Sequence, residues 1–369
     1  MASPTAHDPA AIVGQFRLPG GLVSAVPYGS GHINDTFAVT MRGSDGFRRY
    51  VLQRINHHVF RQPDQLMENV ERVCAHTQRK LAETGAPDAS RRALRLLPTL
   101  AGKAWHTDAD GNRWRCYDFI ENATGHDIVS NPQQAYQAAR AFGAFQALLS
   151  DLPGARLHET IPCFHHTPTR FRNFQAALAR DAHGRADEAS SEIAFALARA
   201  HEVALITDAL RSGEIPERVT HNDTKLNNVL LDNASQEGLC VIDLDTVMPG
   251  SALYDFGDLV RTSTSPAAED ETDLSKVNLQ LPMFEALAKG YLSSASGFLT
   301  TREKELLPFA GKLITFEIGL RFLTDWLEGD TYFKIKRPRH NLDRLRTQFR
   351  LVSSIEEQMT AMQAIVLAA

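Results

Sequence analysis

The spacing of apolar residues divides the chain into a strand-rich first third and a mainly helical remainder. Alternating apolar positions predict four early strands, at 22–27, 36–40, 50–55 and 114–120. Between the third and fourth strands, apolar residues from Leu66 to Leu81 recur at spacings of three and four, which predicts a helix over about 64–84. The first part of the chain is therefore expected to be small and rich in β-structure.

After about residue 121 the pattern changes to helical periods. Helices are predicted at about 132–150, 170–182, 190–212, 281–293 and 303–328. Two short apolar strands, 229–232 and 239–243, interrupt this series as a hairpin. Residues 262–275 are rich in Ser and Thr and then acidic, which is typical of a solvated loop. We expect an α+β fold with one part at 1–121 and another at 122–369.

Composition excludes several classes of protein. The chain has 369 residues, of which 43% are apolar and 22% charged, so it can bury a large core and is not a disordered chain. Its four cysteines are scattered without a CxxC pair, which disfavours a disulfide framework or a zinc knuckle. A net charge of −5, without a basic excess, gives no sign of a nucleic-acid partner or a membrane-surface partner.

Targeting signals are also missing from the sequence pattern. The first fifteen residues lack the basic and apolar regions of a signal peptide. No window approaches the roughly 18 apolar residues of a membrane span. We therefore expect a cytoplasmic location, where ATP is available.

The strongest chemical signal lies at 219–230. His221 and Asp223 are followed five residues later by Asn228, and Asp243 then ends an apolar strand. Transfer of a phosphoryl group from ATP needs a carboxylate to deprotonate the acceptor hydroxyl and hard oxygen ligands for Mg²⁺. The order predicts Asp223 as the catalytic base and Asn228 with Asp243 as the metal ligands.

Further motifs accompany this loop along the chain. They are Gly29–Asn34, Tyr50–Asn56, His221–Leu230, Ile242–Thr246, Met248–Ser251, Arg321–Leu323 and Leu327–Phe333. From about residue 15 to 365 the chain resembles the aminoglycoside phosphotransferase and choline kinase group, and within that group it looks most like bacterial N-acetylhexosamine 1-kinases. The resemblance implies the two-lobed protein-kinase-like fold, with a small β-rich N-lobe and a larger, mainly helical C-lobe.

The resemblance also implies a reaction. It is the ATP- and Mg²⁺-dependent phosphorylation of the anomeric hydroxyl of GlcNAc or GalNAc, which yields the sugar 1-phosphate by direct in-line transfer. Arg321 and Tyr332 would bind sugar hydroxyls, and Asn227 and Asp245 would contact the sugar beside Asp223. A second interpretation of the Arg321 helix is an i,i+4 ladder of ion pairs formed by Glu317, Arg321 and Asp325.

The nucleotide side departs from the protein-kinase pattern. Gly29, Gly31, His32 and Asn34 lie in a turn between strands whose backbone amides are candidates to hold phosphates. Gln53 stands where a protein kinase has its phosphate-binding lysine, and the first lysine of the chain is Lys80. We therefore expect His32, Asn34, Gln53 or Arg54 to meet the phosphates, and the sequence leaves open which of them replaces the lysine. Glu71 is the candidate tether for such a group, with an exposed helix charge as the alternative. Phe119 and Ile120 would form the adenine-binding hinge.

Two further features invite a wrong assignment. Asp255-Phe256-Gly257 spells the metal-binding triplet of protein kinases but follows the hairpin that should carry the metal ligand. We assign Asp255 a supporting role beside the catalytic loop. The pairs His57-His58 and His165-His166 lack partners at metal-ligand spacing and are predicted to be exposed loop histidines.

Two alternatives to the sugar kinase remain. The first is a kinase of the same fold that acts on an amino-alcohol or an aminoglycoside; such cationic acceptors call for acidic clusters and aromatic cages. The second is a non-catalytic, kinase-like binding protein, which would be expected to lack Asp223, Asn228 or Asp243. The sequence leaves open the preferred hexosamine, the stringency for its N-acetyl group and the choice between monomer and homodimer.

Overall fold

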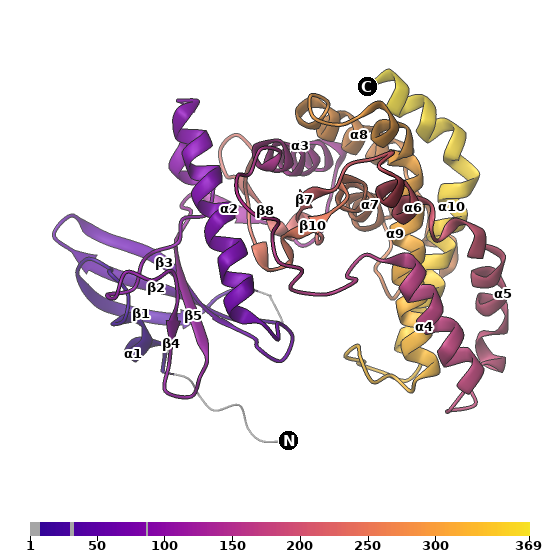
Figure 1. Ribbon diagram of the computed structural model, residues 1–369, viewed down its shortest axis with the longest axis horizontal. Helices are drawn as coiled ribbons and strands as arrows, with labels where there is room; N and C mark the ends of the chain where they lie inside the picture. The colour runs from indigo at the N-terminus through magenta and orange to yellow at the C-terminus, as the bar shows by residue number, and fades with distance from the viewer. Residues whose placement is uncertain (1–7, 30–32, 86–87) are drawn as a thin grey trace. The chain divides into compact units, whose positions relative to one another are not determined.

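The computed structural model describes residues 8–29, 33–85 and 88–369, which fall into two compact units (Figure 1). Unit 1 combines the residues up to Ala123 with Asp151–Ile161 and Leu239–Val247. Unit 2 contains Thr124–Ser150, Pro162–Gly238 and Met248–Ala369. Unit 1 carries an antiparallel sheet and unit 2 is mainly helical, so the predicted α+β fold class is confirmed.

Unit 1 is built on a five-stranded antiparallel sheet with the order β1-β2-β3-β5-β4. Its strands are β1 (Gly21–Pro27), β2 (Asp35–Gly43), β3 (Gly46–Ile55), β4 (His106–Thr107) and β5 (Arg113–Asp118). The turn between β2 and β3 needs the left-handed conformation of Gly46, whose φ is +106°. All four strands predicted for this part of the chain are present.

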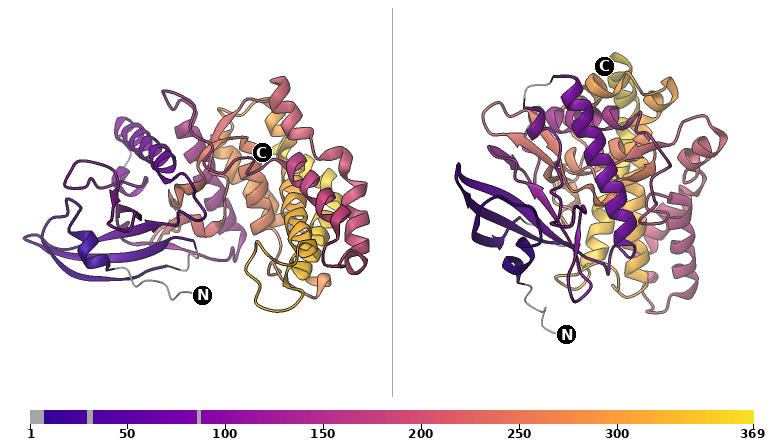
Figure 2. Two further views of the ribbon diagram at one scale, coloured as in Figure 1. Left: turned by 60° about the horizontal axis from the view of Figure 1, so that its bottom comes forward. Right: turned by 60° about the vertical axis from the view of Figure 1, so that its left-hand side comes forward.

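The two faces of this sheet have different partners. Alternate residues of β2, β3 and β5 pack with the short helix α1 (Pro9–Val13) in a core that includes Val39, Leu52, Trp114 and Cys116. Arg115 lies between Trp114 and Cys116 and therefore points to the opposite face. On that face its guanidinium reaches the sulfur of Met67 in helix α2 (Pro63–Glu83), which runs beside the sheet in Figure 2.

The buried side chain of Asn69 in α2 joins the three sequence segments of unit 1. Its amide nitrogen donates to the carbonyl oxygen of His158 at 2.8 Å and to that of Val247 at 3.2 Å. Its amide oxygen accepts from the backbone N–H of His158 at 2.9 Å. Two segments that are distant in sequence are therefore attached to the same helix.

Unit 2 is a helical assembly with short strands. Its helices are α3 (Pro132–Leu149), α4 (Thr167–Arg180), α5 (Ser190–Ala198), α6 (Leu205–Ser212), α7 (Ala252–Ser263), α8 (Leu281–Ala295), α9 (Thr301–Leu327) and α10 (His340–Ala368). The remaining strands of the chain are β6 (Ala123–Gly125), β7 (Arg218–Thr220), β8 (Val229–Asp232), β9 (Gly238–Val241) and β10 (Met248–Gly250). Within unit 2, β7 pairs with β10.

Two helix predictions were wrong in part. The helix predicted over 190–212 is divided into α5 and α6 by a 3-10 turn at Ala200–Glu202, although no Gly or Pro marks the break. At this break, the side chain of Arg199 at the end of α5 forms hydrogen bonds with the carboxylate of Glu356 in α10. No helix was predicted beyond residue 328, but α10 lies there. Its buried residues, which include Leu342 and Phe349, recur at spacings of three and four.

The long helix α9 lies at the centre of unit 2 and is buried along most of its length. Thr300 and Glu303 form a capping box at its start. Gly257 lets α7 approach it closely, because a Cβ at that position would be 2.5 Å from the carbonyl oxygen of Ala310. Among the described residues, no helix is both long enough and apolar enough to cross a membrane.

Candidate active site

The loop between β7 and β8 carries the predicted catalytic residues and is held from α7. Asp255, which is fully buried, accepts the backbone N–H of His221 at 2.9 Å and that of Asn222 at 2.7 Å. Gln146 donates to the same carboxylate at 2.5 Å. Burial raises the pKa of Asp255, and these donors act in the opposite direction. The contacts agree with the supporting role predicted for Asp255, which stays a prediction.

Asp223 follows Asn222, which adopts the left-handed conformation with φ +64°. The ammonium of Lys225 lies 2.7 Å from one carboxylate oxygen of Asp223. Burial alone would raise the pKa of Asp223, but the charges of Lys225, His221 and Arg261 outweigh it and hold the pKa below its ordinary value. Asp223 is therefore ionised near neutral pH, as a proton acceptor must be. Lys225 was not among the predicted site residues.

The side chain of Asn228 is oriented by the same loop. Its amide nitrogen donates to the carbonyl oxygen of Asp223 at 2.8 Å and to the carboxylate of Asp223 at 3.1 Å. Since the nitrogen is used in this way, the amide oxygen is the atom that Asn228 can offer to a cation. Asn227, the predicted neighbour of the sugar, is exposed on the short 3-10 turn before β8.

The other predicted metal ligand belongs to unit 1. Asp243 comes two residues after the end of β9 and adopts the left-handed conformation with φ +60°. Such a backbone is unfavourable for a residue other than Gly and is tolerated best by Asn and Asp. Burial lowers the pKa of Arg115, but nearby charges, that of Asp245 first, outweigh it and raise the pKa, and the charge of Asp243 adds a smaller contribution.

A buried polar network in unit 1 surrounds Asp245. Arg115, only 1% exposed, forms an ion pair with one carboxylate oxygen of Asp245, which is itself 3% exposed. Asn34 donates to the other oxygen at 2.6 Å, and Arg115 also donates to the amide oxygen of Gln53 at 3.1 Å. Both oxygens of Asp245 thus have partners within unit 1, while its predicted contact with substrate stays untested.

Arg115 is a residue that the sequence analysis missed. The available signal was a single charged residue between Trp114 and Cys116 in an otherwise apolar stretch of strand. Arg115 and Gln53 oppose each other in the register of β5 and β3. Gln53, at the position where a protein kinase would have its lysine, therefore accepts a hydrogen bond from the buried Arg115 of the neighbouring strand.

The other nucleotide candidates lie at separate places in unit 1. Gly29 has φ +84° and leaves open space where a Cβ would be, whereas Gly31 and His32 lie outside the described residues. The Phe119 ring meets the Tyr28 ring edge-on at 5.4 Å and lies 3.8 Å from the guanidinium carbon of Arg49. The last two candidates differ in exposure: Ile120 is buried, whereas Glu71 is exposed on α2. The tethering role of Glu71 stays a prediction.

The ion-pair ladder considered for α9 is wrong. Glu317 is fully buried and accepts from Thr167 at 2.7 Å, while one of its oxygens lies 2.9 Å from Nδ1 of His165. Asp325 accepts the backbone N–H groups of Thr331, Tyr332 and Phe333 and the amide of Asn341. Neither carboxylate pairs with Arg321, because each has its partners in another part of unit 2.

Arg321 instead lies against the aromatic residues that follow α9. Its guanidinium carbon is 5.8 Å from the centre of the Tyr332 ring and 5.4 Å from that of Phe333, and it also reaches the Tyr332 hydroxyl at 3.5 Å. Arg170 of α4 is a second cation here: burial lowers its pKa, and the charge of Arg321 lowers it further. Tyr332 itself is 72% exposed.

The prediction of exposed loop histidines was wrong for His165-His166. His165 is 8% exposed, and its Nε2 lies 3.0 Å from the carbonyl oxygen of Asn222. His166 caps α4 by accepting the backbone N–H of Thr169 at 3.2 Å. In the other pair, His58 is exposed and His57 is half-buried.

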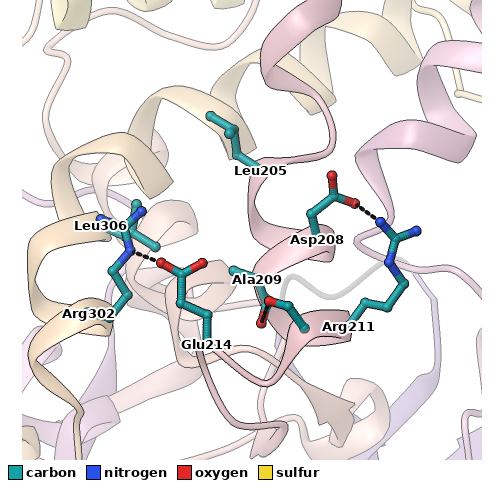
Figure 3. Close-up of a pocket in the computed structure, with 8 residues that line it drawn as sticks. Leu205, Asp208, Ala209, Arg211, Glu214, Arg302 and Leu306 are labelled. Carbon is teal, nitrogen blue, oxygen red and sulfur yellow. Dashed lines mark hydrogen bonds and ion pairs between the residues drawn. The ribbon is translucent and has the colours of Figure 1, made fainter.

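A separate hollow of about 330 Å³ lies in unit 2 against α6 and α9 (Figure 3). Its charged side chains are already paired, Arg302 with Glu214 at 2.6 Å and Arg211 with Asp208 at 3.1 Å. None of the predicted site residues lines it.

Comparison with known proteins gives consistent matches. A family model described as a phosphotransferase enzyme family matches residues 24–288. An aminoglycoside phosphotransferase from Alicyclobacillus acidocaldarius shows 15% identity over 100% of this chain and 98% of its own, with a TM-score of 0.61. The GDP complex of wild-type aminoglycoside 2'-phosphotransferase-IIIa shows 12% identity over 89% and 93%, with a TM-score of 0.53. At these identities the two likenesses establish the fold.

Proposed function

The chain belongs to the phosphotransferase enzyme family, and from that premise we propose that it is an ATP-dependent kinase of N-acetylhexosamines. The proposed acceptor is the anomeric hydroxyl of GlcNAc or GalNAc, and the product is the sugar 1-phosphate. The nucleotide complex of the aminoglycoside 2'-phosphotransferase, whose fold this chain shares, supports a nucleotide as the phosphoryl donor.

In the proposed reaction Asp223 receives the proton of the acceptor. The anomeric oxygen attacks the γ-phosphorus of ATP, the bond from phosphorus to the ADP oxygen breaks, and the hydroxyl proton passes to the Asp223 carboxylate. Two observations support this role: Asn228 and Lys225 bond to the carboxylate, and the pKa below the ordinary value keeps it in the ionised form that can accept a proton. The chemistry needs no covalent phosphoenzyme.

The side chains of Asn228 and Asp243 fit a magnesium ion by their chemistry. Asn228 uses its amide nitrogen within the loop, which leaves a hard oxygen donor, and Asp243 supplies a carboxylate. When bound, Mg²⁺ neutralises charge on the phosphate groups of ATP. Asp243→Ala is therefore expected to weaken the use of Mg·ATP, and an unchanged Mg²⁺ dependence of kcat/KM would contradict this assignment.

The surroundings of Arg321 favour a neutral sugar over a cationic acceptor, and this observation carries the proposal. Arg321 and Arg170 place two positive charges near Tyr332. The two nearest carboxylates on α9, Glu317 and Asp325, are buried and already bonded to groups of the protein. The Tyr332 and Phe333 rings, which could form a cage for an ammonium group, already have a guanidinium beside them.

Arg321 and Tyr332 are suited to a sugar in other respects. A guanidinium presents several N–H donors in a fixed plane, which matches the adjacent hydroxyl oxygens of a pyranose. The exposed face of Tyr332 offers apolar area beside these donors, as sugar-binding sites require.

The proposal is tested by acceptor-dependent ADP release with Mg·ATP. The panel contains GlcNAc, GalNAc, glucose, galactose, choline and an aminoglycoside, and ³¹P NMR identifies any product. We expect turnover with the N-acetyl sugars and the phosphorus signal of a sugar 1-phosphate. Turnover only with choline or the aminoglycoside would agree with the catalytic role assigned to the loop. It would reject the assignment of Arg321 and Tyr332 as sugar-binding residues. Bound ATP with no turnover of any acceptor would reject the sugar-kinase proposal.

A further inference from the structure

His165 joins the catalytic loop to the helix that carries Arg321. It lies in the segment before α4, 152 residues from Glu317. One side of its ring faces the Glu317 carboxylate, with 2.9 Å between Nδ1 and Oε1. The other side faces the carbonyl oxygen of Asn222, with 3.0 Å between Nε2 and that oxygen.

Both neighbours of the ring are hydrogen-bond acceptors. A neutral imidazole has only one N–H, so it can satisfy one of these acceptors and presents a lone pair to the other. The imidazolium donates on both sides and satisfies both. Burial alone would lower the pKa of His165, but the hydrogen bond and charge of Glu317 raise it above its ordinary value. The two acceptors beside the ring and the raised pKa of His165 therefore both favour the imidazolium form.

The two residues held by His165 are next to the site. Asn222 directly precedes Asp223 and has a left-handed backbone, a conformation that Asn tolerates better than most residues. Glu317 stands four residues before Arg321, on the same face of α9. His165 thus contacts both the residue before the proposed base and the helix that carries the proposed acceptor arginine.

Other groups around the pair agree with a fixed arrangement. The second oxygen of Glu317 accepts a hydrogen bond from the hydroxyl of Thr167. Burial alone would raise the pKa of Glu317, but the hydrogen bond and charge of His165 outweigh burial and lower the pKa. The Tyr254 ring of α7 packs against the His165 ring, with 5.4 Å between their centres. The charges that act on the pair are those of Asp258 in α7 and Arg170 in α4.

We propose that His165 is a positioning residue that sets Asp223 relative to Arg321, so that the hydroxyl of an acceptor held by Arg321 meets the Asp223 carboxylate. This inference rests on the proposed function for its catalytic part. His165 does not touch the reacting atoms; it acts through the carbonyl of Asn222 on one side and through Glu317 on the other.

The first test replaces the carboxylate and keeps its shape. In Glu317→Gln the histidine loses its charge partner, and a neutral ring that donates to the new amide oxygen presents a lone pair to the Asn222 carbonyl. We expect kcat to fall by about tenfold to a hundredfold at pH 8, as for a misplaced base, with a smaller change in KM for ATP. Without the charge of Glu317, burial lowers the pKa of His165, so the loss of kcat relative to the wild-type protein should persist at pH 6.

The matched control is Glu356→Gln in α10. Glu356 is another carboxylate with a lowered pKa, and it pairs with Arg199 and with Lys312 of α9. It lies outside the proposed machinery. We expect this variant to lose thermal stability and to retain kcat.

A second measurement is independent of turnover. His165→Gln should accelerate amide hydrogen exchange at His221 and Asn222 by at least about tenfold at native temperature, whereas Glu356→Gln should not. If kcat of Glu317→Gln and His165→Gln matches that of the control, or if exchange in this loop is unchanged, the inference is wrong. If wild-type protein phosphorylates no acceptor, the proposed function fails, while the exchange measurement still decides whether His165 holds the loop.

Discussion

At the scale of single residues, the structure pairs charges that are removed from water. Glu317 with His165 is such a pair in unit 2, and Arg115 with Asp245 is the corresponding pair in unit 1. The pair of Asp223 and Lys225 is different, because its side chains remain 28% and 42% exposed. Breaking a buried pair by removing one partner is costly, because the remaining charge has no solvent to stabilise it. Substitutions at these positions should therefore have large effects.

Asp223→Asn tests the base directly. The amide has nearly the same shape as the carboxylate but cannot accept the proton, so kcat should fall by about 10²-fold to 10⁴-fold. ADP binding, measured by calorimetry, should change little because the proposed nucleotide contacts remain. A variant with a kcat near that of the wild-type protein would reject Asp223 as the base.

Arg115→Met tests the buried pair of unit 1. It leaves the Asp245 carboxylate buried without its cation, which should destabilise the protein by about 3–5 kcal/mol. Combining it with Asp245→Asn removes the uncompensated charge and should recover part of the loss. Thermal unfolding measures both variants.

The control for Arg115 is Arg48→Met. Arg48 pairs with Asp45 at 3.3 Å, and both side chains are exposed, so this pair should contribute less than about 1 kcal/mol. Equal losses for Arg115→Met and Arg48→Met would show that the buried network is not important for stability.

At the scale of elements, periodicity located most helices but not what each helix face contacts. In α9, Glu317, Arg321 and Asp325 share a face by spacing, and from spacing alone an ion-pair ladder is a reasonable expectation. Each carboxylate instead binds a segment that is not part of the helix. The positions of α4 and of the residues after α9 decide these contacts, and no pattern within α9 reports them.

Gly257→Ala tests the crossing of α7 and α9. The new methyl group would lie 2.5 Å from the carbonyl oxygen of Ala310, so the helices must separate, at a cost of about 1–3 kcal/mol. Gly297→Ala is the matched control, since nothing lies within 4 Å of a Cβ at that position. Thermal melting should distinguish the two variants, and similar melting temperatures would contradict close packing at Gly257.

At the scale of the whole molecule, chain order and spatial grouping differ. Unit 1 incorporates two short segments from later in the chain, Asp151–Ile161 and Leu239–Val247, and the second contains Asp243 and Asp245. The buried amide of Asn69 bonds to both segments. One α2 side chain therefore helps to place the strand end that carries a proposed metal ligand.

Asn69→Ala should loosen these segments. The loss of its hydrogen bonds leaves buried carbonyl groups unsatisfied, which should cost about 1–3 kcal/mol in stability. Amide hydrogen exchange should increase over residues 151–161. Gln78→Ala on the same helix is the control, because Gln78 bonds to the carbonyl of Leu94 instead. Faster exchange at 151–161 in both variants, or in neither, would contradict the specific role of Asn69.

The sequence by itself determined the features that depend on near neighbours. The strands at 36–40 and 50–55 follow from alternation, and the order of Asp223, Asn228 and Asp243 along the chain indicates a phosphoryl-transfer loop. Both signals come from residues in one stretch of the chain, and they indicated a β-rich first part and phosphoryl transfer. The family and the two-lobed fold were expected from the resemblance of several motifs along the chain.

The tertiary structure decided which distant residues meet. Arg115 and Asp245 are 130 residues apart, and His165 and Glu317 are 152 apart, so no periodicity connects them. The fold also changes the surroundings of single groups: His165, predicted to be an exposed loop residue, is a buried ring between two hydrogen-bond acceptors. The surroundings of His165 depend on the packing of distant segments: burial lowers its pKa, but the hydrogen bond and charge of Glu317 raise it.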